Sequence, residues 1–372
     1  MATYFGVGCF HFGLSKPVPY KFEFREYIEE IHKALGALTN ASNINIKADR
    51  SGSIFPDHVE ISGIALRKNG VIFPNTLDMI VEFSLYIPAR IQDELGPFKE
   101  TSKATSTENF HVRIKYEFQT PVAIITLINP ASEDPSPSRA VAMIRKYLDR
   151  EIAKSNTEIM FDWLGPSPFH AEFSAEADPA SDYGFVLKKI PSRGYDKINI
   201  LYGKDINKNQ AEAYIYDSIS SDASVFYEII RTRSFMYRAQ EKVVSQWKNL
   251  QGLIDSGEAR ASRGRKKILE AANLLVRESH SLMASQKVHR QAAERVVKEH
   301  FGRGEDDFLE HYVESELKGL PEYPAQDILE WAKYIEEGLL KKKDRFNVLL
   351  TGMLGGLIGA LATIVSGLSK SS

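Results

Sequence analysis

The feature that most constrains this chain is a run of 23 residues without a charged side chain, Phe346 to Leu368, close to its C-terminal end. As an α-helix, such a run is about 34 Å long, and the hydrocarbon core of a bilayer is about 30 Å thick. The sequence therefore predicts one transmembrane helix over 346–368, here called the apolar segment. The alternative is a helix buried in a soluble domain, which the five glycines of the run favour because glycine lowers its hydrophobicity.

The charges that flank the apolar segment predict its orientation. Four basic residues, here called the basic run, precede it: Lys341, Lys342, Lys343 and Arg345. Only Lys370 is charged beyond it. By the positive-inside rule, we expect residues 1–345 to lie in the cytoplasm and the protein to be a single-pass, tail-anchored membrane protein. The first ten residues contain no positive charge and too short an apolar stretch for a signal peptide.

The apolar segment also separates small from bulky side chains when it is drawn as a helix with about 100° per residue. One half, here called the small face, carries Gly352, Gly355, Gly356, Gly359, Ala360, Ala362, Thr363, Ser366 and Gly367. The other half carries leucine, isoleucine, valine and methionine. Small residues let helix backbones approach closely in lipid, so the sequence predicts a homo-oligomer that packs through this face.

Composition narrows the class of protein without identifying a ligand. A chain of 372 residues is long enough for two or three domains, and 43% hydrophobic residues can supply sizeable cores. The net charge of −2 gives no reason to expect a nucleic-acid partner. The single cysteine, Cys9, excludes an intrachain disulfide and a cysteine-based zinc site. No motif indicates a metal, and the cofactor is unknown.

Residues 1–205 have the pattern of an α+β domain. Strict alternation over His111–Phe118 predicts a strand with one buried face, and the nearly continuous apolar run Val122–Ile128 predicts a central strand. Other strands are expected near 3–12, 158–163, 168–175, 183–190 and 195–202, and helices near 21–38 and 139–152. Because a helix followed by strands occurs twice, we also consider that 1–130 and 138–205 are two similar halves.

Strand signals stop after residue 205, and helical spacing of apolar residues begins. Residues 206–345 therefore predict a helical stalk built on an antiparallel hairpin of two long helices, with its loop near 257–264. Two shorter helices are expected near 306–318 and 325–345, the last one leading to the apolar segment. A helical region of this length also suits contact with a protein partner.

The soluble part carries little recognisable chemistry. Phosphate-binding, zinc-protease and nucleophile-elbow motifs are missing from the sequence. Gly6-Val7-Gly8 lacks the third glycine of a dinucleotide loop, so a tight strand is the favoured interpretation. Five basic residues between Arg260 and Lys267 are expected in the hairpin loop, where a solvated surface is the default. The alternatives are contact with phosphate, with anionic lipid or with an acidic patch of a partner. The acidic stretch Glu305–Glu316 is interpreted as a solvated helix start, and the alternative is a cation bound at helical i, i+4 spacing.

One pair of residues is a candidate for catalysis. Arg295 and His300 have the Arg-x4-His spacing found at a helix end in the HEPN ribonuclease superfamily, and this stretch resembles that motif. The resemblance implies an acid and an electrostatic clamp acting on a phosphodiester, usually across a dimer. The polar residue that commonly follows the arginine in that family is a valine here, Val296. The alternative is a solvated helix end where a cation is favoured.

Three functional hypotheses follow. The favoured one is a membrane-anchored sensor or effector that oligomerises through its tail and permeabilises or disrupts the bilayer, as in bacterial stress or phage defence. The second is a membrane-tethered enzyme, such as a HEPN-like ribonuclease that uses Arg295 and His300. The third is a scaffold that holds a partner at the membrane.

Overall fold

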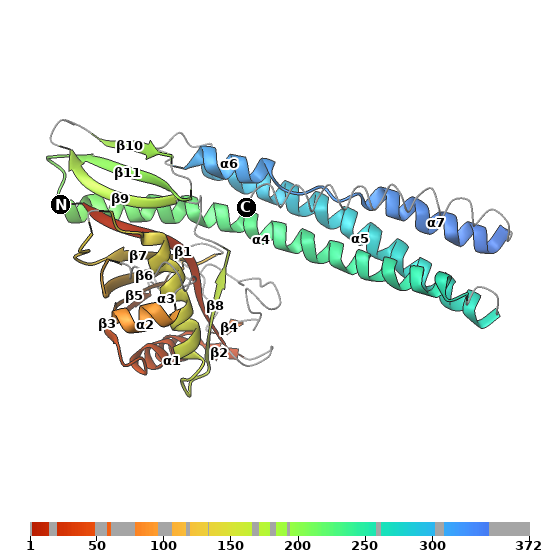
Figure 1. The fold of residues 1–372 in the computed structure, drawn as a ribbon, viewed down its shortest axis with the longest axis horizontal. Helices are drawn as coiled ribbons and strands as arrows, with labels where there is room; N and C mark the ends of the chain where they lie inside the picture. Colours follow the sequence, from red (N-terminus) through yellow and green to blue (C-terminus); the bar gives the residue numbers. More distant parts are fainter. Residues whose placement is uncertain are drawn as a thin grey trace. The chain divides into compact units, whose positions relative to one another are not determined.

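The computed structural model describes residues 2–14, 21–48, 58–60, 79–95, 106–116, 120–132, 134–165, 171–178, 184–191, 194–257, 262–301 and 309–341 (Figure 1). The chain divides into two compact units. Unit 1 comprises Met1–Ser234 and Ala292–Leu320, and unit 2 comprises Phe235–Gln291 and Pro321–Ser372. Unit 1 therefore combines the strand-rich region expected over 1–205 with helical segments from later in the chain.

Unit 1 is built on one sheet in which nine of the described strands take part. The strands are β1 (Thr3–Leu14), β3 (Ala41–Ala48), β5 (Met79–Tyr86), β6 (Asn109–Lys115), β7 (Val122–Leu127), β8 (Ile159–Leu164), β9 (Ala171–Asp178), β10 (Phe185–Ile190) and β11 (Asp196–Gly203). Their order is β10-β11-β9-β1-β7-β6-β5-β3, and β8 pairs with β1 outside this path. Two short strands, β2 (Lys21–Glu23) and β4 (His58–Glu60), form a separate antiparallel pair.

The long strand β1 holds the sheet together. Its first half pairs antiparallel with β7 on one side and β9 on the other, and its second half pairs antiparallel with β8. The strands β3, β5, β6 and β7 form an antiparallel meander, whereas β9 and β11 pair in parallel. Strands from both 1–130 and 138–205 thus take part in one sheet.

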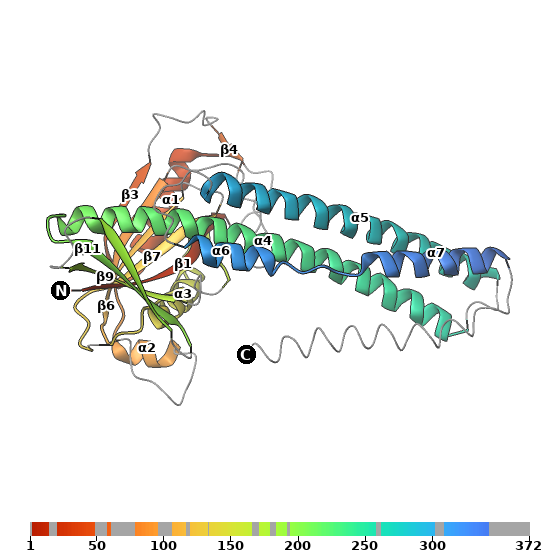
Figure 2. The ribbon, with the colours of Figure 1, turned by 90° about the horizontal axis from the view of Figure 1, so that it is seen from above.

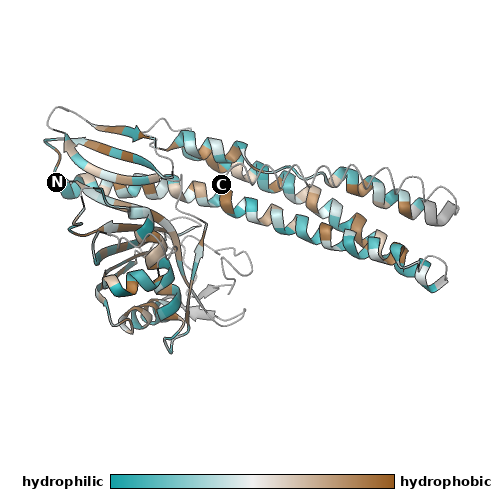
Figure 3. Ribbon diagram, viewed as in Figure 1, coloured by the Kyte–Doolittle hydropathy of each residue, from teal (hydrophilic) through white to brown (hydrophobic). Residues whose placement is uncertain are grey.

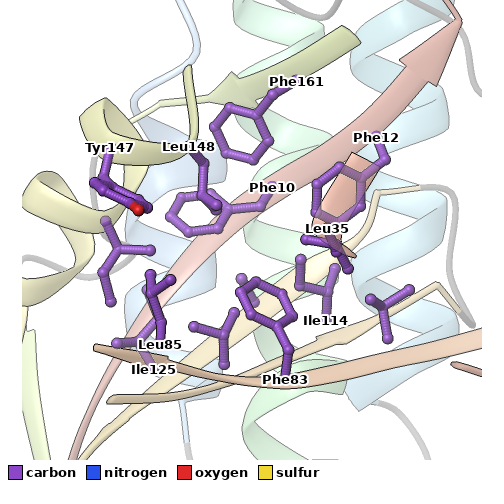
Figure 4. Close-up of a cluster of buried hydrophobic side chains, with 14 of the residues drawn as sticks. Phe10, Phe12, Leu35, Phe83, Leu85, Ile114, Ile125, Tyr147, Leu148 and Phe161 are labelled. Carbon is purple, nitrogen blue, oxygen red and sulfur yellow. The ribbon is translucent and has the colours of Figure 1, made fainter. Parts of the chain in front are cut away.

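Helices cover both faces of this sheet, which gives unit 1 three layers (Figures 1 and 2). The first face packs against α1 (Phe24–Gly36), α2 (Ala89–Leu95) and α3 (Pro137–Ile152). Figure 4 shows the core on this side, where Phe10 and Phe12 of β1 meet Phe83, Leu148 and Phe161. Every side chain of β7 is buried, which confirms the central strand expected at 122–128.

The second face of the sheet is covered by the unit 1 portions of α4 (Lys208–Asp255) and α5 (Ser262–Phe301), with α6 (Glu310–Lys318) packed in the same core. Polar contacts fix α4 on the strands. Lys115 Nζ of β6 lies 3.1 Å from Asp217 Oδ1, and the hydroxyls of Thr126 and Tyr216 are 3.0 Å apart. The expected helical region after residue 205 is confirmed, because α4 begins at Lys208.

The described part of unit 2 consists mainly of helices, namely the remaining portions of α4 and α5 together with α7 (Ala325–Lys341). Their apolar stripes form a core that includes Val243, Leu250, Ile268, Leu275, Leu282, Ile328 and Ile335, and Figure 3 shows the hydrophobic positions along these helices. Trp247 of α4 and Trp331 of α7 pack with their ring centroids 3.8 Å apart. The expected hairpin is present, and α7 is its third packed helix.

Candidate functional site

Arg295 and His300, the candidate catalytic pair, are both in α5 but point in different directions. Residues five apart on an α-helix are separated by about 140° around its axis. The side chain of Arg295 is 73% exposed, and its Nε lies 3.8 Å from Glu299 Oε1. The side chain of His300 is only 22% exposed and contacts α4. The structure therefore places the two residues in separate environments within one chain.

His300 belongs to a polar cluster centred on Asp222. His300 Nε2 is 3.0 Å from Asp222 Oδ1, and the backbone N–H of Leu309 donates to Asp222 Oδ2 at 3.1 Å. The Asp222 side chain is only 5% exposed. One buried carboxylate thus ties α4 to the end of α5 and to the start of α6. Both carboxylate oxygens have partners from later segments of the chain, so this cluster holds three segments of unit 1 together.

Asp222 was not predicted from the sequence as a buried polar contact, although its position on α4 indicates one. It continues the apolar stripe of α4 at helical spacing from Ile215 and Ile219 towards Phe226, all of which are buried. A charged residue on a stripe that is otherwise apolar predicts a buried, partnered carboxylate. The partner itself lies 78 residues away in the chain.

A second group of buried polar side chains lies on β1 and β8. Cys9 and His11 of β1 face Leu164 and Asp162 of β8 in register, and all four side chains are buried. Burial raises the pKa of the Cys9 thiol far above its usual range, which keeps it protonated and removes it as a nucleophile. Burial also lowers the pKa of His11 to about 3, so its imidazole is neutral near pH 7.

Gly6 and Gly8 of β1 form a tight strand, as expected, and not a nucleotide loop. β1 pairs with β7 in continuous register through both positions. A Cβ atom on Gly6 would lie 2.6 Å from Val141 Cγ2 and 2.7 Å from the carbonyl oxygen of Pro137. The glycine is therefore needed because the first turn of α3 crosses directly over β1.

Two of the acidic residues of α6, Glu314 and Glu316, are held in ion pairs. Glu314 Oε2 lies 2.9 Å from Lys318 Nζ, and Glu316 Oε2 lies 2.6 Å from Arg233 Nη2 of α4. Glu305, Asp306 and Asp307 lie outside the described residues. In the part of the chain that the structure describes, no group of three or more His, Cys, Asp or Glu side chains is arranged to hold a metal ion.

The helix α7 runs towards the end of unit 2 at which α4 ends and α5 begins. Arg290 of α5 pairs at 3.4 Å with Glu322, which precedes α7, and Trp331 then packs on Trp247. Because Arg290 is far along α5 from Ser262, α7 runs antiparallel to α5 and parallel to α4. Figures 1 and 2 both show α7 ending near the last turn of α4 and the first turn of α5.

The spacing of residues agrees with this arrangement. From the tryptophan pair, α4 continues for eight residues to Asp255 and α7 for ten residues to Lys341. At 1.5 Å per residue these distances are about 12 Å and about 15 Å. Lys341, the first member of the basic run, therefore ends α7 at the level of the hairpin loop.

Four exposed basic residues occupy the same end of unit 2. They are Arg263, Arg265, Lys266 and Lys267 at the start of α5, here called the hairpin-tip patch. The four described residues of the predicted basic cluster thus lie in the first turns of α5 and not in the hairpin loop where they were expected, while Arg260 lies outside the described residues. Asp255 of α4 and Glu270 of α5 are the exposed acidic residues closest in sequence among those described, and Glu270 Oε1 is 3.9 Å from Lys266 Nζ.

The apolar segment, its small face (Gly352, Gly355, Gly356, Gly359, Ala360, Thr363 and Gly367) and Lys342, Lys343 and Arg345 lie outside the described residues. Among the helices that the structure does describe, none combines the length and the hydropathy required to cross a bilayer. No known protein family, curated protein or solved structure matches this chain.

Proposed function

We propose that this protein is a membrane-anchored sensor or effector whose tail helices associate in the bilayer. The observation that carries the proposal is the position of Lys341. It ends α7 at one extremity of unit 2, and the chain continues from there into the rest of the basic run and then into the charge-free segment 346–368. Because α7 ends at the tip of the helix bundle and not along its side, the residues that follow it can connect directly to a membrane anchor.

The orientation and the association are argued from the sequence. The basic run before the apolar segment favours a cytoplasmic location for residues 1–345. The small face favours close helix–helix packing between copies, because small residues allow backbone contact in lipid. Tails that associate in this way give the protein a means to disrupt or permeabilise the bilayer.

Unit 1 is the proposed receiver of the signal. It has its own two-sided core, and α4 and α5 each contribute residues to both units. These two helices provide a covalent route by which a change in unit 1 can reach unit 2. Direct support for a catalytic role is weak, since Cys9 and His11 are buried and Arg295 is separated from His300 around α5.

Anchoring is tested by membrane fractionation. Full-length protein is expected to sediment with membranes and to resist carbonate extraction, while a chain that ends at Leu340 is expected to stay in the supernatant. Recovery of the full-length protein in a detergent-free soluble fraction would contradict the proposal. Protease added outside sealed cells is a second test, because the α4–α5 loop should be protected if the basic run lies in the cytoplasm.

Dye release from vesicles separates the effector from the tethered enzyme and the scaffold. Release that depends on the apolar segment supports the effector. His300→Ala is expected to leave biological activity close to that of the unmodified protein. If this substitution abolished activity or an associated nuclease activity in a protein that stayed folded, the tethered ribonuclease would replace the effector as the preferred function.

A further inference from the structure

We infer that the hairpin-tip patch binds the anionic headgroups of the membrane in which the tail is anchored. This inference rests on the proposed function, because it needs the tail to bring unit 2 to a bilayer. It adds a second, electrostatic contact made by the folded part of the protein. The sequence alone offered this cluster only as a loop with several alternative uses.

The first argument is position. Lys341 ends α7 level with the α4–α5 connection, so the hairpin-tip patch and the start of the basic run share one end of unit 2. The apolar segment begins five residues after Lys341. Five residues of any backbone conformation span at most about 18 Å, so a bilayer entered at Phe346 lies close to this end of the bundle.

The second argument is charge. All four side chains of the hairpin-tip patch are exposed, and no acidic residue lies in the first turn of α5. Basic residues at a helix N-terminus are unfavourable, because the backbone dipole already places partial positive charge there. Lys266 pairs with Glu270 at 3.9 Å, so part of the charge of the patch is offset within α5. An anionic surface would offset the repulsion, and each basic residue near such a surface strengthens binding about fivefold.

The occupant is a lipid headgroup because, under the proposed function, the chain enters the bilayer within five residues of Lys341, which ends α7 at this end of unit 2. The charges of the hairpin-tip patch are presented on one turn and a half of helix and in no described cleft, which suits a surface of many weak anionic sites. Such binding is screened by salt, and the screening length falls from about 8 Å at physiological ionic strength to about 3 Å at 1 M.

The test uses the full-length protein reconstituted into vesicles of phosphatidylcholine, either alone or mixed with phosphatidylserine. A fluorophore is attached at Ser256→Cys, an exposed position at the end of α4, and headgroup spin-labelled lipid acts as the quencher. Cys9 can remain, because it is buried and its thiol is protonated. Val288→Cys is the control position, exposed on α5 and about 39 Å along that helix from Ser262.

We expect quenching at position 256 to be several-fold stronger in the mixed vesicles, to fall in 1 M salt, and to stay low at position 288. Replacing the hairpin-tip patch with glutamine should reduce quenching to the level in neutral vesicles. The matched control removes four other exposed basic residues of α5, namely Arg277, Lys287, Arg295 and Lys298, and should preserve it.

Two outcomes would overturn the inference without touching the proposed function. One is equal quenching in neutral and mixed vesicles, which would mean that the tail alone sets the distance and that the patch has another partner. The other is an equal loss in the two glutamine variants, which would reflect total charge and not this site. Failure of the protein to stay with vesicles after carbonate washing is a separate readout, and it would contradict the anchoring itself.

Discussion

His300 Nε2 lies 3.0 Å from Oδ1 of Asp222, which joins the last turn of α5 to α4. The second carboxylate oxygen accepts the backbone N–H of Leu309. Asp222 thus hydrogen-bonds both the imidazole of His300 and the buried backbone N–H of Leu309, which belong to two later segments of the chain. Such a contact explains why unit 1 includes Ala292–Leu320, although its strands end at Gly203.

Asp222→Ala should destabilise the protein by about 1–3 kcal/mol, because the substitution leaves the buried N–H of Leu309 without its acceptor. Denaturant unfolding of the purified full-length protein measures this loss. Asp217→Ala is the matched control, five residues earlier on α4. Asp217 is half-exposed and pairs with Arg113 and Lys115, so its loss should cost no more than about 1 kcal/mol. A control variant as unstable as Asp222→Ala would show that Asp222 is not a special contact.

Gly6→Ala should also be destabilising, by about 1–3 kcal/mol, because the new methyl group would meet Val141 and the backbone oxygen of Pro137. Gly36→Ala provides the comparison, since nothing lies within 4 Å of a Cβ atom at the end of α1. That substitution should be neutral or stabilising by up to about 1 kcal/mol. Unfolding midpoints of the two variants measure the contrast. Equal midpoints would mean that α3 can shift away from β1.

The lowered pKa of buried His11 predicts that the protein loses stability in mild acid. The pKa of His11 is about 3 in the folded protein against an ordinary value of 6.5, so the unfolded chain takes up a proton that the folded chain does not. Stability should therefore fall as pH decreases below 6.5, and this group contributes a loss of about 2 kcal/mol between pH 7 and pH 5.

The His11→Gln variant isolates this effect, because it removes the titrating group and keeps a polar side chain at the site. Its stability should change less than that of the unmodified protein between pH 7 and pH 5, whatever its absolute value. Asp162 lies opposite His11 in register on β8, and its carboxylate could stabilise a protonated His11. If Asp162 held a protonated His11, the unmodified protein would show the smaller loss.

Much of the fold could be predicted from local patterns. The strand expected at 122–128 is β7 at Val122–Leu127, and the helix expected at 139–152 is α3 at Pro137–Ile152. These elements have strong periodicity, and the sequence around them contains turn residues. β5 has a comparable signal, because Met79, Val81, Phe83 and Leu85 alternate with less buried residues. Periodicity of this kind depends only on which face is buried.

Pairing between distant segments could not be predicted in the same way. β1 changes its partner along its length from β9 to β8, and neither choice is encoded in the alternation of β1 itself. The apolar stripe of α7, with Ile328 and Ile335, was visible as a helix, but its packing on the hairpin depends on Trp247 and on the whole unit 2 core. For the same reason, local patterns do not indicate that the hairpin-tip patch and Lys341 share one end of the bundle.

The last prediction concerns the small face of the apolar segment. Gly356→Leu places a bulky side chain where we expect two backbones to touch, and it should weaken association of the tails in membranes. Leu357→Ile, on the bulky face, should have little effect, because that face is expected to meet lipid. Both variants remain hydrophobic enough to insert. Crosslinking in membranes, or a reporter of helix association fused to the tail, measures the difference.

Helix propensity strengthens this comparison, because it opposes the expected result. Gly→Leu should stabilise the isolated helix by somewhat under about 1 kcal/mol, so a loss of association cannot be ascribed to a damaged helix. A parallel loss of dye release in Gly356→Leu would link the contact to the proposed effect on the bilayer. If both variants associated equally well, the small face would not be the contact between copies. The effector proposal would then lose its main support, and a monomeric tether would be the better description.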